Sequence, residues 1–584
     1  MKLSTKILIL ALALILIGST TAWLVQTNGG QVAIKNVRFA GSNGIVQNAT
    51  LYIPKGVTKE NPAPGIVAIH GYINTNETQA GFAIEFARRG YVVLAVDQTG
   101  HGYSDPPAFA NGFGGPPALA FMHTLDIVDQ NNIGLEGHSM GGWASLIAAA
   151  TYPDGYKSIV LEGSSTGTFG APDGTPTFPR NLAVVFSKYD EFSALMWGAP
   201  VPVDIVATDK LKTLFGTDEN VVPGQLYGSI EDGTARILYQ PPVTHPGDHL
   251  STQAIGHAID WFQRTLDGGQ PIPPSNQIWY WKEIGNLVAL IGMVLLLFAA
   301  GMILLQTRFF SELLEQPAPA KAAKGIGWWV AALIFVILPP LTLFPFKGLF
   351  EVLGWQASAL FPQNITTQVI IWTTLLGVIS LVLFLLWHFA LNRATNPNGD
   401  HYGITWGRKI LWRKVGKSFL LAFLVALAGY VSLLLVAFFF KTDYRFWVFA
   451  VKPMNALQFR ISLSYLIPFI FFFLVAGTIL HGQLRREHMG MGREMLLNWV
   501  LMVIGYIGLL LYQYIPLLAG HTLANPAEPL WTIIAFQFLP LMTIVALVKT
   551  YFFRKTGHIY VGAFLSAVLI TWIVVASQAI HFAF

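Results

Sequence analysis

A serine lies between two glycines in the segment Gly137-His138-Ser139-Met140-Gly141. An apolar run precedes this segment and a helical pattern over 143–151 follows it, which predicts that Ser139 lies on a tight strand-to-helix turn. A side chain two positions before or after the serine would collide with neighbouring backbone, so the glycines are required there. Such a turn exposes the Ser139 hydroxyl as a nucleophile and leaves the N–H of Met140 at a helix start, where it can stabilise an oxyanion.

The segments around this turn alternate between strand and helix patterns. Strands are predicted at 65–69, 91–96, 158–161, 182–186 and 237–239, and helices at 82–89, 116–132 and 252–266. Alternation of this kind is typical of a mostly parallel sheet with crossover helices on its faces. We therefore expect Ser139 at the carboxyl edge of such a sheet.

Three ordered motifs carry a family resemblance. They are His70-Gly71-Tyr72, the Asp-x-x-Gly-His-Gly-x-Ser-Asp loop at 97–105 and the Gly-His-Ser-Met-Gly-Gly turn at 137–142. Together they resemble the α/β-hydrolase superfamily, nearest its serine-aminopeptidase, monoglyceride-lipase and dienelactone-hydrolase-like branches. The resemblance covers about 32–266 and implies that the backbone N–H of Tyr72 is a second oxyanion donor.

The resemblance also implies the other two members of a catalytic triad. Asp190 follows the strand at 182–186, where the family usually carries its acid, and His249 directly precedes the closing helix, where it commonly carries its base. His245 is the alternative base, in which case the acid should be re-examined against Glu191 and Asp204. Serine needs such a base to become nucleophilic, and the histidine needs a carboxylate to fix its tautomer.

Composition places part of the chain in lipid. Of its 584 residues, 53% are hydrophobic and only 11% are charged, which is too apolar for an ordinary soluble protein. Residues 28–283 hold 14 Lys and Arg against 23 Asp and Glu, and the remainder holds 22 against 8. The positive excess thus belongs to the apolar part and does not indicate nucleic-acid binding. The chain has no Cys, and neither a metal site nor a cofactor is expected.

Nine apolar segments are long enough to span a bilayer. The first, at 7–25, follows two lysines and is interpreted as an uncleaved anchor, with a cleaved signal peptide as the alternative. The other eight are at 284–305, 326–346, 369–391, 419–440, 462–480, 496–519, 530–547 and 559–580. If the N-terminus is cytoplasmic, the inside segments carry 17 Lys and Arg and the short outside loops carry 5. The positive-inside rule then predicts a multi-pass cell-membrane protein whose hydrolase domain is extracytoplasmic.

The predicted fold class is an α/β-hydrolase domain joined to an all-α polytopic transmembrane bundle. The expected domains are an N-terminal anchor at 1–27, the hydrolase domain at 28–270, a linker at 271–283 and an eight-helix transmembrane domain at 284–584. Two roles stay open for the bundle: it only anchors the hydrolase domain, or it also presents lipid-derived substrates to it.

The predicted function is that of a membrane-bound serine hydrolase that cleaves carboxylic esters, including lipid-derived ones, through an acyl-enzyme. The expected partners are a small acyl ester or peptide and the bilayer. A peptidase, an amidase or an acyltransferase on the same triad is the alternative. A non-catalytic sensing or transport-coupled membrane protein is the alternative from another class. The sequence predicts neither the substrate nor the oligomeric state.

Overall fold

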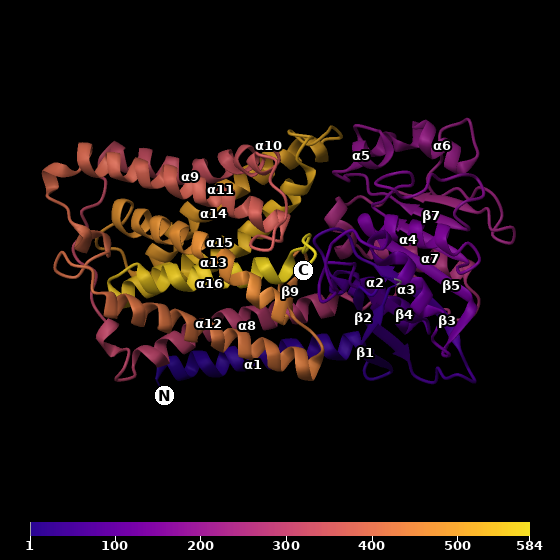
Figure 1. The fold of residues 1–584 in the computed structure, drawn as a ribbon, viewed down its shortest axis with the longest axis horizontal. Coiled ribbons are helices and arrows are strands. Elements are labelled where there is room, and N and C mark those ends of the chain that lie inside the picture. The colour runs from indigo at the N-terminus through magenta and orange to yellow at the C-terminus, as the bar shows by residue number, and fades with distance from the viewer. Residues whose placement is uncertain (1, 42) are drawn as a thin grey trace.

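The computed structural model describes residues 2–41 and 43–584. A mixed sheet covered by helices forms one end of the molecule, and long helices running along the longest axis form the other (Figure 1). The first helix runs from the far end of the bundle to the sheet, so the two parts are joined at the start of the chain as well as at residues 271–279. The expected fold class is confirmed.

Eight strands form one sheet in the order β1-β2-β4-β3-β5-β6-β7-β8. Their bounds are β1 Val32–Ala40, β2 Val46–Pro54, β3 Ala63–Ile69, β4 Val92–Val96, β5 Val128–His138, β6 Ser158–Glu162, β7 Leu182–Val185 and β8 Arg236–Tyr239. The strands from β4 to β8 are parallel, whereas β1 pairs with β2 and β2 with β4 in antiparallel fashion. The parallel strands are buried on both faces, which explains their continuous apolar runs.

Helices cover both faces of this sheet. The helices α2 (Ala80–Arg88) and α7 (Thr252–Thr265) pack on one face, and α3 (Gly115–Met122) and α4 (Met140–Thr151) pack on the other. The prediction of one helix over 116–132 is wrong in its second half, because α3 ends at Met122. The chain turns after Met122 and enters β5 at Val128, where it pairs with Ala63 of β3. Strand pairing overrides the helical pattern there.

Nine helices of the described residues are long and apolar enough to cross a membrane, in agreement with the predicted number. They are α1 Leu3–Gln26, α8 Tyr280–Leu305, α9 Gly325–Lys347 continued by α10 Leu349–Val352, α11 Asn364–Leu386, α12 Trp412–Phe440, α13 Ala456–Thr478, α14 Met491–Leu518, α15 Pro529–Thr556 and α16 Tyr560–Ser577. The first of them packs closely on α8, because a Cβ on Gly18 would meet the backbone of Gly285 and Ala289. Small residues of this kind let membrane helices approach one another.

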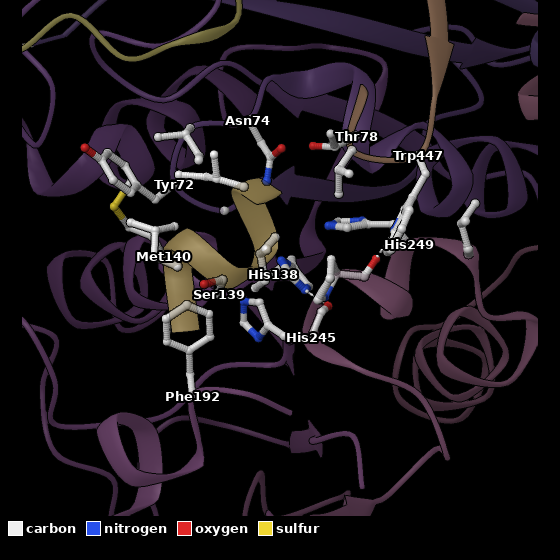
Figure 2. Close-up of a pocket in the computed structure, with 18 of the residues that line it drawn as sticks. Tyr72, Asn74, Thr78, His138, Ser139, Met140, Phe192, His245, His249 and Trp447 are labelled. Atoms are coloured by element: carbon white, nitrogen blue, oxygen red, sulfur yellow. Dashed lines mark hydrogen bonds between the residues drawn. The ribbon is translucent and has the colours of Figure 1, made fainter. Parts of the chain in front are cut away.

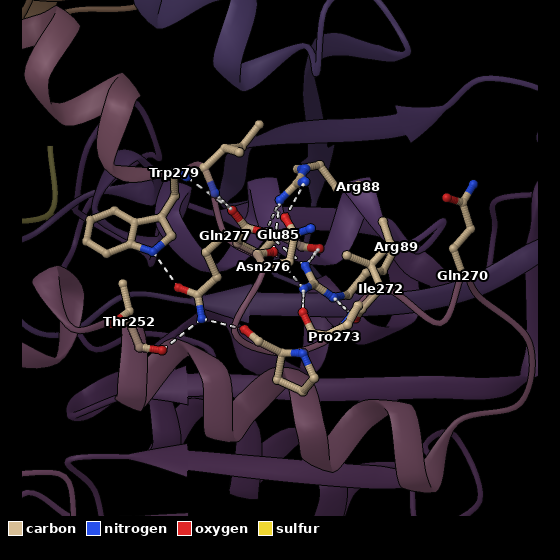
Figure 3. A network of polar contacts seen from close by, with 12 residues as sticks. Glu85, Arg88, Arg89, Thr252, Gln270, Ile272, Pro273, Asn276, Gln277 and Trp279 are labelled. Atoms are coloured by element: carbon tan, nitrogen blue, oxygen red, sulfur yellow. Dashed lines mark hydrogen bonds and ion pairs between the residues drawn. The ribbon is translucent and has the colours of Figure 1, made fainter.

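The segment expected as a linker at 271–283 is fixed to the surface of α2 (Figure 3). The Arg89 guanidinium donates to the carbonyls of Ile272 at 3.1 Å and Pro273 at 2.7 Å. The Glu85 carboxylate accepts the N–H groups of Ile278 at 2.6 Å and Trp279 at 3.1 Å. We call residues 28–270 the hydrolase part. Because α8 begins at Tyr280, directly after these contacts, this helix starts from a fixed point on the hydrolase part.

A short hairpin of the bundle reaches into the hydrolase part. It consists of β9 (Tyr444–Phe446) and β10 (Phe449–Val451), between α12 and α13. Its buried Arg445 pairs with Asp443 at 2.8 Å and lies 3.4 Å from Thr75 Oγ1 of the hydrolase part. A buried charge without a partner is costly, so the ion pair of Arg445 with Asp443 favours one fixed position of the hairpin.

Candidate active site

The candidate site residues lie after the ends of four strands, at one edge of the sheet. Tyr72 follows β3, Ser139 follows β5, Asp190 follows β7 and His245 follows β8, and these strands all run parallel. The carboxyl ends of parallel strands meet at one edge of the sheet, where ligands of α/β folds usually bind. Segments far apart in the sequence are thereby brought together.

Ser139 is held on a strained turn between β5 and α4. Its φ of 55° and ψ of −122° lie outside the backbone conformations that residues other than glycine usually adopt. A Cβ on Gly137 would collide with the backbone of Gly141, and a Cβ on Gly141 would collide with the carbonyl of Ile69. Both glycines are thus required by close backbone approach. Because α4 begins at Met140, the N–H of that residue lies at a helix start.

The segment after β3 passes directly beside the serine. A Cβ on Gly71 would lie only 3.0 Å from the Cβ of Ser139. The following residue, Tyr72, lines the same cavity as Ser139, and its hydroxyl lies 2.9 Å from His581 Nε2. The segment at Tyr72 therefore adjoins Ser139, and Figure 2 shows Tyr72 and His245 on opposite sides of the serine.

Asp190 and His245 form a buried hydrogen-bonded pair. The Asp190 Oδ2 and His245 Nδ1 atoms are 2.8 Å apart, and the other oxygen of Asp190 accepts the N–H of Phe192 at 2.8 Å. A carboxylate that accepts the proton of Nδ1 leaves Nε2 free to accept a proton from another group. The imidazole of His245 lies next to Ser139 in Figure 2, and both residues line one cavity.

Burial controls the protonation of this pair. Burial lowers the pKa of His245 to about 4, while the nearby Asp248 opposes that shift. Burial and the charge of Asp248 raise the pKa of Asp190, and the hydrogen bond from Phe192 acts in the opposite direction by stabilising the carboxylate. His245 is therefore neutral at pH 7 and can accept a proton.

The expected pairing of His249 with Asp190 requires correction. His249 does precede α7, but neither of its ring nitrogens has a hydrogen-bond partner among residues 2–41 and 43–584, and its ring packs 6.1 Å from that of Phe82. The physical reason is the conformation of the segment from His245 to Leu250, which is a 3₁₀ helix. With about three residues per turn, side chains four residues apart point in different directions, so only one of the two histidines faces Asp190. That histidine is His245.

Two further polar residues lie next to these histidines. The ring of His138 lies 4.6 Å from that of His245 and 4.2 Å from that of His249, and its Nε2 is 3.0 Å from the His245 carbonyl. Asp248 lies 3.5 Å from His138 Nε2 and accepts the hydroxyl of Ser187 at 2.5 Å. These contacts fix the backbone of the segment from His245 to Leu250, which we call the histidine turn.

The alternative acids have other roles in the structure. Asp204 is exposed in a short 3₁₀ helix (Pro202–Ala207) and does not line the cavity. Glu191 accepts the backbone N–H of His245 at 2.8 Å through Oε2, and its Oε1 accepts the hydroxyl of Tyr514 at 2.5 Å. Tyr514 belongs to α14 of the bundle, so a transmembrane helix contacts the histidine turn through one side chain.

A second contact from the bundle reaches the same turn. Trp447, at the tip of the β9–β10 hairpin, donates its indole N–H to the carbonyl of Pro246 at 2.6 Å. Its own backbone N–H donates to Glu283 at 3.2 Å. No sequence pattern indicated Tyr514 or Trp447, because both reach the site only through the packing of the bundle on the sheet.

The cavity at Ser139 has a volume of about 500 Å³. The hydrolase part contributes mainly aromatic and apolar side chains, among them Phe109, Phe113, Trp143, Phe169, Phe192 and Leu195. The bundle contributes the opposite wall through Trp447 and through Leu530, Ile533 and Ile534 of α15. Within residues 2–41 and 43–584, no group of three or more His, Cys, Asp or Glu side chains is placed to hold a metal ion. The arrangement offers a nucleophile, a base and an apolar chamber.

Comparison with known proteins agrees with this geometry. The family model described as the alpha/beta hydrolase fold matches residues 64–286. This part of the chain has the α/β-hydrolase fold. The hydrolase part is 24% identical over 258 residues to a cutinase of Thermobifida alba, a match that covers 42% of this chain and 75% of the cutinase.

Two further similarities lie in the same part of the chain. An uncharacterized protein of Mycobacterium tuberculosis is 30% identical over 105 residues, and the match covers 17% of this chain and 28% of that relative. The match thus spans less than a third of the length of the mycobacterial protein. Among solved structures, a bacterial heroin esterase is 16% identical with a TM-score of 0.31, and the match covers 43% of this chain and 89% of that one.

Proposed function

We propose that this protein is a membrane-bound serine esterase with Ser139 as the nucleophile, His245 as the base and Asp190 as the acid. The observation that carries the proposal is the buried Asp190–His245 hydrogen bond beside a serine held on a strained turn. Ester cleavage is favoured because the relatives include a cutinase and the chamber is apolar. The proposed triad also argues against a non-catalytic sensing or transport role.

The proposed reaction runs in two halves. In the first, Ser139 Oγ attacks the ester carbonyl carbon while its proton passes to His245 Nε2, and the carbonyl electron pair moves onto the oxygen. The backbone N–H groups of Tyr72 and Met140 are proposed to hold that oxyanion. When the carbonyl re-forms, the ester C–O bond breaks and the alcohol leaves with the proton from His245.

The second half frees the enzyme. Water attacks the acyl-enzyme while His245 takes its proton, and the bond between the acyl group and Ser139 Oγ breaks as that oxygen recovers the proton. Asp190 takes up no proton in either half of the proposed reaction, because its role is to orient the imidazole and stabilise the imidazolium. A hydroxyl-bearing acceptor in place of water would give an acyltransferase, so product analysis separates the two activities.

We also propose that the hydrolase part faces outward from the cell membrane. The loops at the end of the bundle away from the sheet contact one another, for example Glu315 with Lys555 and Ala318 with Arg485. These loops carry most of the 17 basic residues counted above, and basic loops are usually cytoplasmic. The N-terminal helix α1 starts at this same end (Figure 1), which supports a cytoplasmic N-terminus.

A fluorophosphonate probe tests the proposed mechanism directly. The purified full chain should be labelled once, at Ser139, and should hydrolyse p-nitrophenyl esters faster than the matched anilides. The Ser139→Ala variant should lose both activities, while Ser145→Ala, a buried serine of α4 whose hydroxyl faces Glu136 rather than the cavity, should keep them. Labelling that persists in Ser139→Ala would place the nucleophile elsewhere.

A further inference from the structure

The cavity at Ser139 is the first of three that follow one another into the bundle. The second has a volume of about 40 Å³ and shares the lining residues Ile534 and Gln537 with the first. The third has a volume of about 760 Å³ and shares Tyr506 and Met542 with the second. Neighbouring cavities therefore adjoin at side chains that line both of them.

One face of helix α15 lines the whole row. Its lining residues are Leu530, Ile533, Ile534, Gln537, Phe538, Leu541 and Met542. Residues spaced by three and four positions lie on one side of a helix. The rise from Leu530 to Met542 is about 18 Å, slightly more than one leaflet of a hydrocarbon core that is about 30 Å thick.

The chemistry of the row suits a long, apolar and flexible group. Polar and charged groups line the first cavity, at the Ser139 end, and the helix α15 side of the row is apolar apart from the amide of Gln537. The second cavity adds aromatic side chains such as Trp372 and Phe538. An unbranched hydrocarbon chain can follow such a narrow path, whereas a peptide would leave its backbone groups without hydrogen-bond partners.

We infer that this row of cavities binds the long acyl chain of an ester whose carbonyl lies at Ser139, a conclusion that rests on the proposed esterase function. The chain passes Ile534 and Gln537 and ends beside Leu541 in the membrane part. The bundle thus determines which esters the hydrolase part cleaves.

The first test is an acyl-chain profile of the full-length protein. We expect kcat/KM for p-nitrophenyl esters to rise from butyrate through octanoate to palmitate, by at most about fourfold for each buried methylene. A flat profile, or one that falls with chain length, would overturn the inference. The proposed function would survive that result as long as butyrate is hydrolysed and Ser139 is labelled, and only a failure of both would count against it.

Two variants then probe different depths of the row. Ile534→Phe narrows the passage out of the first cavity and should lower kcat/KM for palmitate by at least about tenfold, the scale that a misfit in an apolar pocket produces. Leu541→Phe lies deeper and should reduce palmitate hydrolysis while sparing octanoate. Fluorophosphonate labelling of Ser139 is measured in both variants, because any labelling shows that the catalytic centre is still formed.

Ile544→Phe is the matched control. Ile544 is buried on the same helix but lines none of the three cavities. If Ile544→Phe lowered kcat/KM for palmitate as much as Ile534→Phe does, the effect would come from general overpacking of the helix and the inference would fail.

The source of the ester can be assigned in the same experiment. Monopalmitoylglycerol dissolved in phosphatidylcholine vesicles with the reconstituted protein is compared with palmitoyl ester in detergent micelles. Hydrolysis confined to vesicles assigns a bilayer lipid as the substrate, and equal hydrolysis assigns a freely diffusing ester. Both results support an acyl-chain site, whereas palmitate left intact in both preparations would contradict it.

Discussion

Tyr514 of the transmembrane helix α14 donates its hydroxyl to Glu191 at 2.5 Å, and Glu191 directly follows Asp190 in the sequence. The second oxygen of the same carboxylate accepts the backbone N–H of His245 at 2.8 Å. One side chain thus connects the bundle to the turn that carries the proposed base. The bundle therefore contributes one contact to the surroundings of that turn.

Removing that hydroxyl should weaken catalysis without weakening binding. Tyr514→Phe leaves one oxygen of the buried Glu191 unpaired, and a lost hydrogen bond of this kind costs about 1–2 kcal/mol. We expect kcat to fall by about tenfold while KM for a short ester stays unchanged. Tyr512→Phe, on the same helix but 61% exposed, is the control. Equal activity of the two variants would show that the contact does not position His245.

The two histidines of the 245–250 turn should differ sharply. His245→Ala removes the group that faces Asp190 and should lower turnover on the order of a thousandfold. His249→Ala removes a ring packed against Phe82 and should cost stability more than turnover. Turnover and the thermal midpoint are measured for both variants. The original expectation would be restored if His249→Ala were the inactive protein.

Buried carboxyl groups near the site should make the fold sensitive to alkali. Burial raises the pKa of Glu136 from 4.5 to about 8, with a hydrogen bond from Gln79 acting in the opposite direction. The folded state therefore holds a proton that the unfolded state has lost. This contribution is complete below pH 4.5 and is lost as the pH rises through about 8.

Thermal inactivation midpoints measured across that pH range give the test. The wild-type midpoint should fall as the pH rises from 4.5 to about 8, and Glu136→Gln, which cannot ionise, should reduce that fall. The exposed Glu60→Gln should behave like the wild type. An unchanged alkaline loss in Glu136→Gln would mean that other groups control it.

Cysteine labelling can test the orientation without background, because the chain contains no Cys. Thr177→Cys, exposed on the hydrolase part, should react with an impermeant maleimide in intact cells. His488→Cys, exposed in a loop at the far end of the bundle, should react only after the cells are opened. The reverse pattern would invert the proposed topology.

The sequence predicts those features whose causes are local. Gly137 is needed because a Cβ there would meet the backbone of Gly141, within a few residues of Ser139, so the turn could be recognised from a short motif. The transmembrane helices were equally predictable, because hydropathy acts along each segment separately. The helix expected over 116–132 failed because pairing of Val128 with β3 depends on a distant strand.

The identity of the paired histidine was not predictable for a similar reason. His245 and His249 differ by four positions, and only the 3₁₀ conformation of their segment decides which one faces Asp190. The contacts of Trp447 and Tyr514 are still less local, since they depend on how the bundle docks on the sheet. Neither residue lies in a motif that signals its role.

The strap of residues 271–279, fixed to α2 by Arg89 and Glu85, has a consequence for making a soluble reagent. A fragment cut after this strap would keep the sheet and the triad but would lose the wall formed by Trp447 and α15. Its aromatic chamber would then face water, and exposed apolar surfaces of this kind promote aggregation. Inhibitors selected against such a fragment would be fitted to an open groove that the intact protein does not present, so screening campaigns need the whole chain in a detergent or nanodisc.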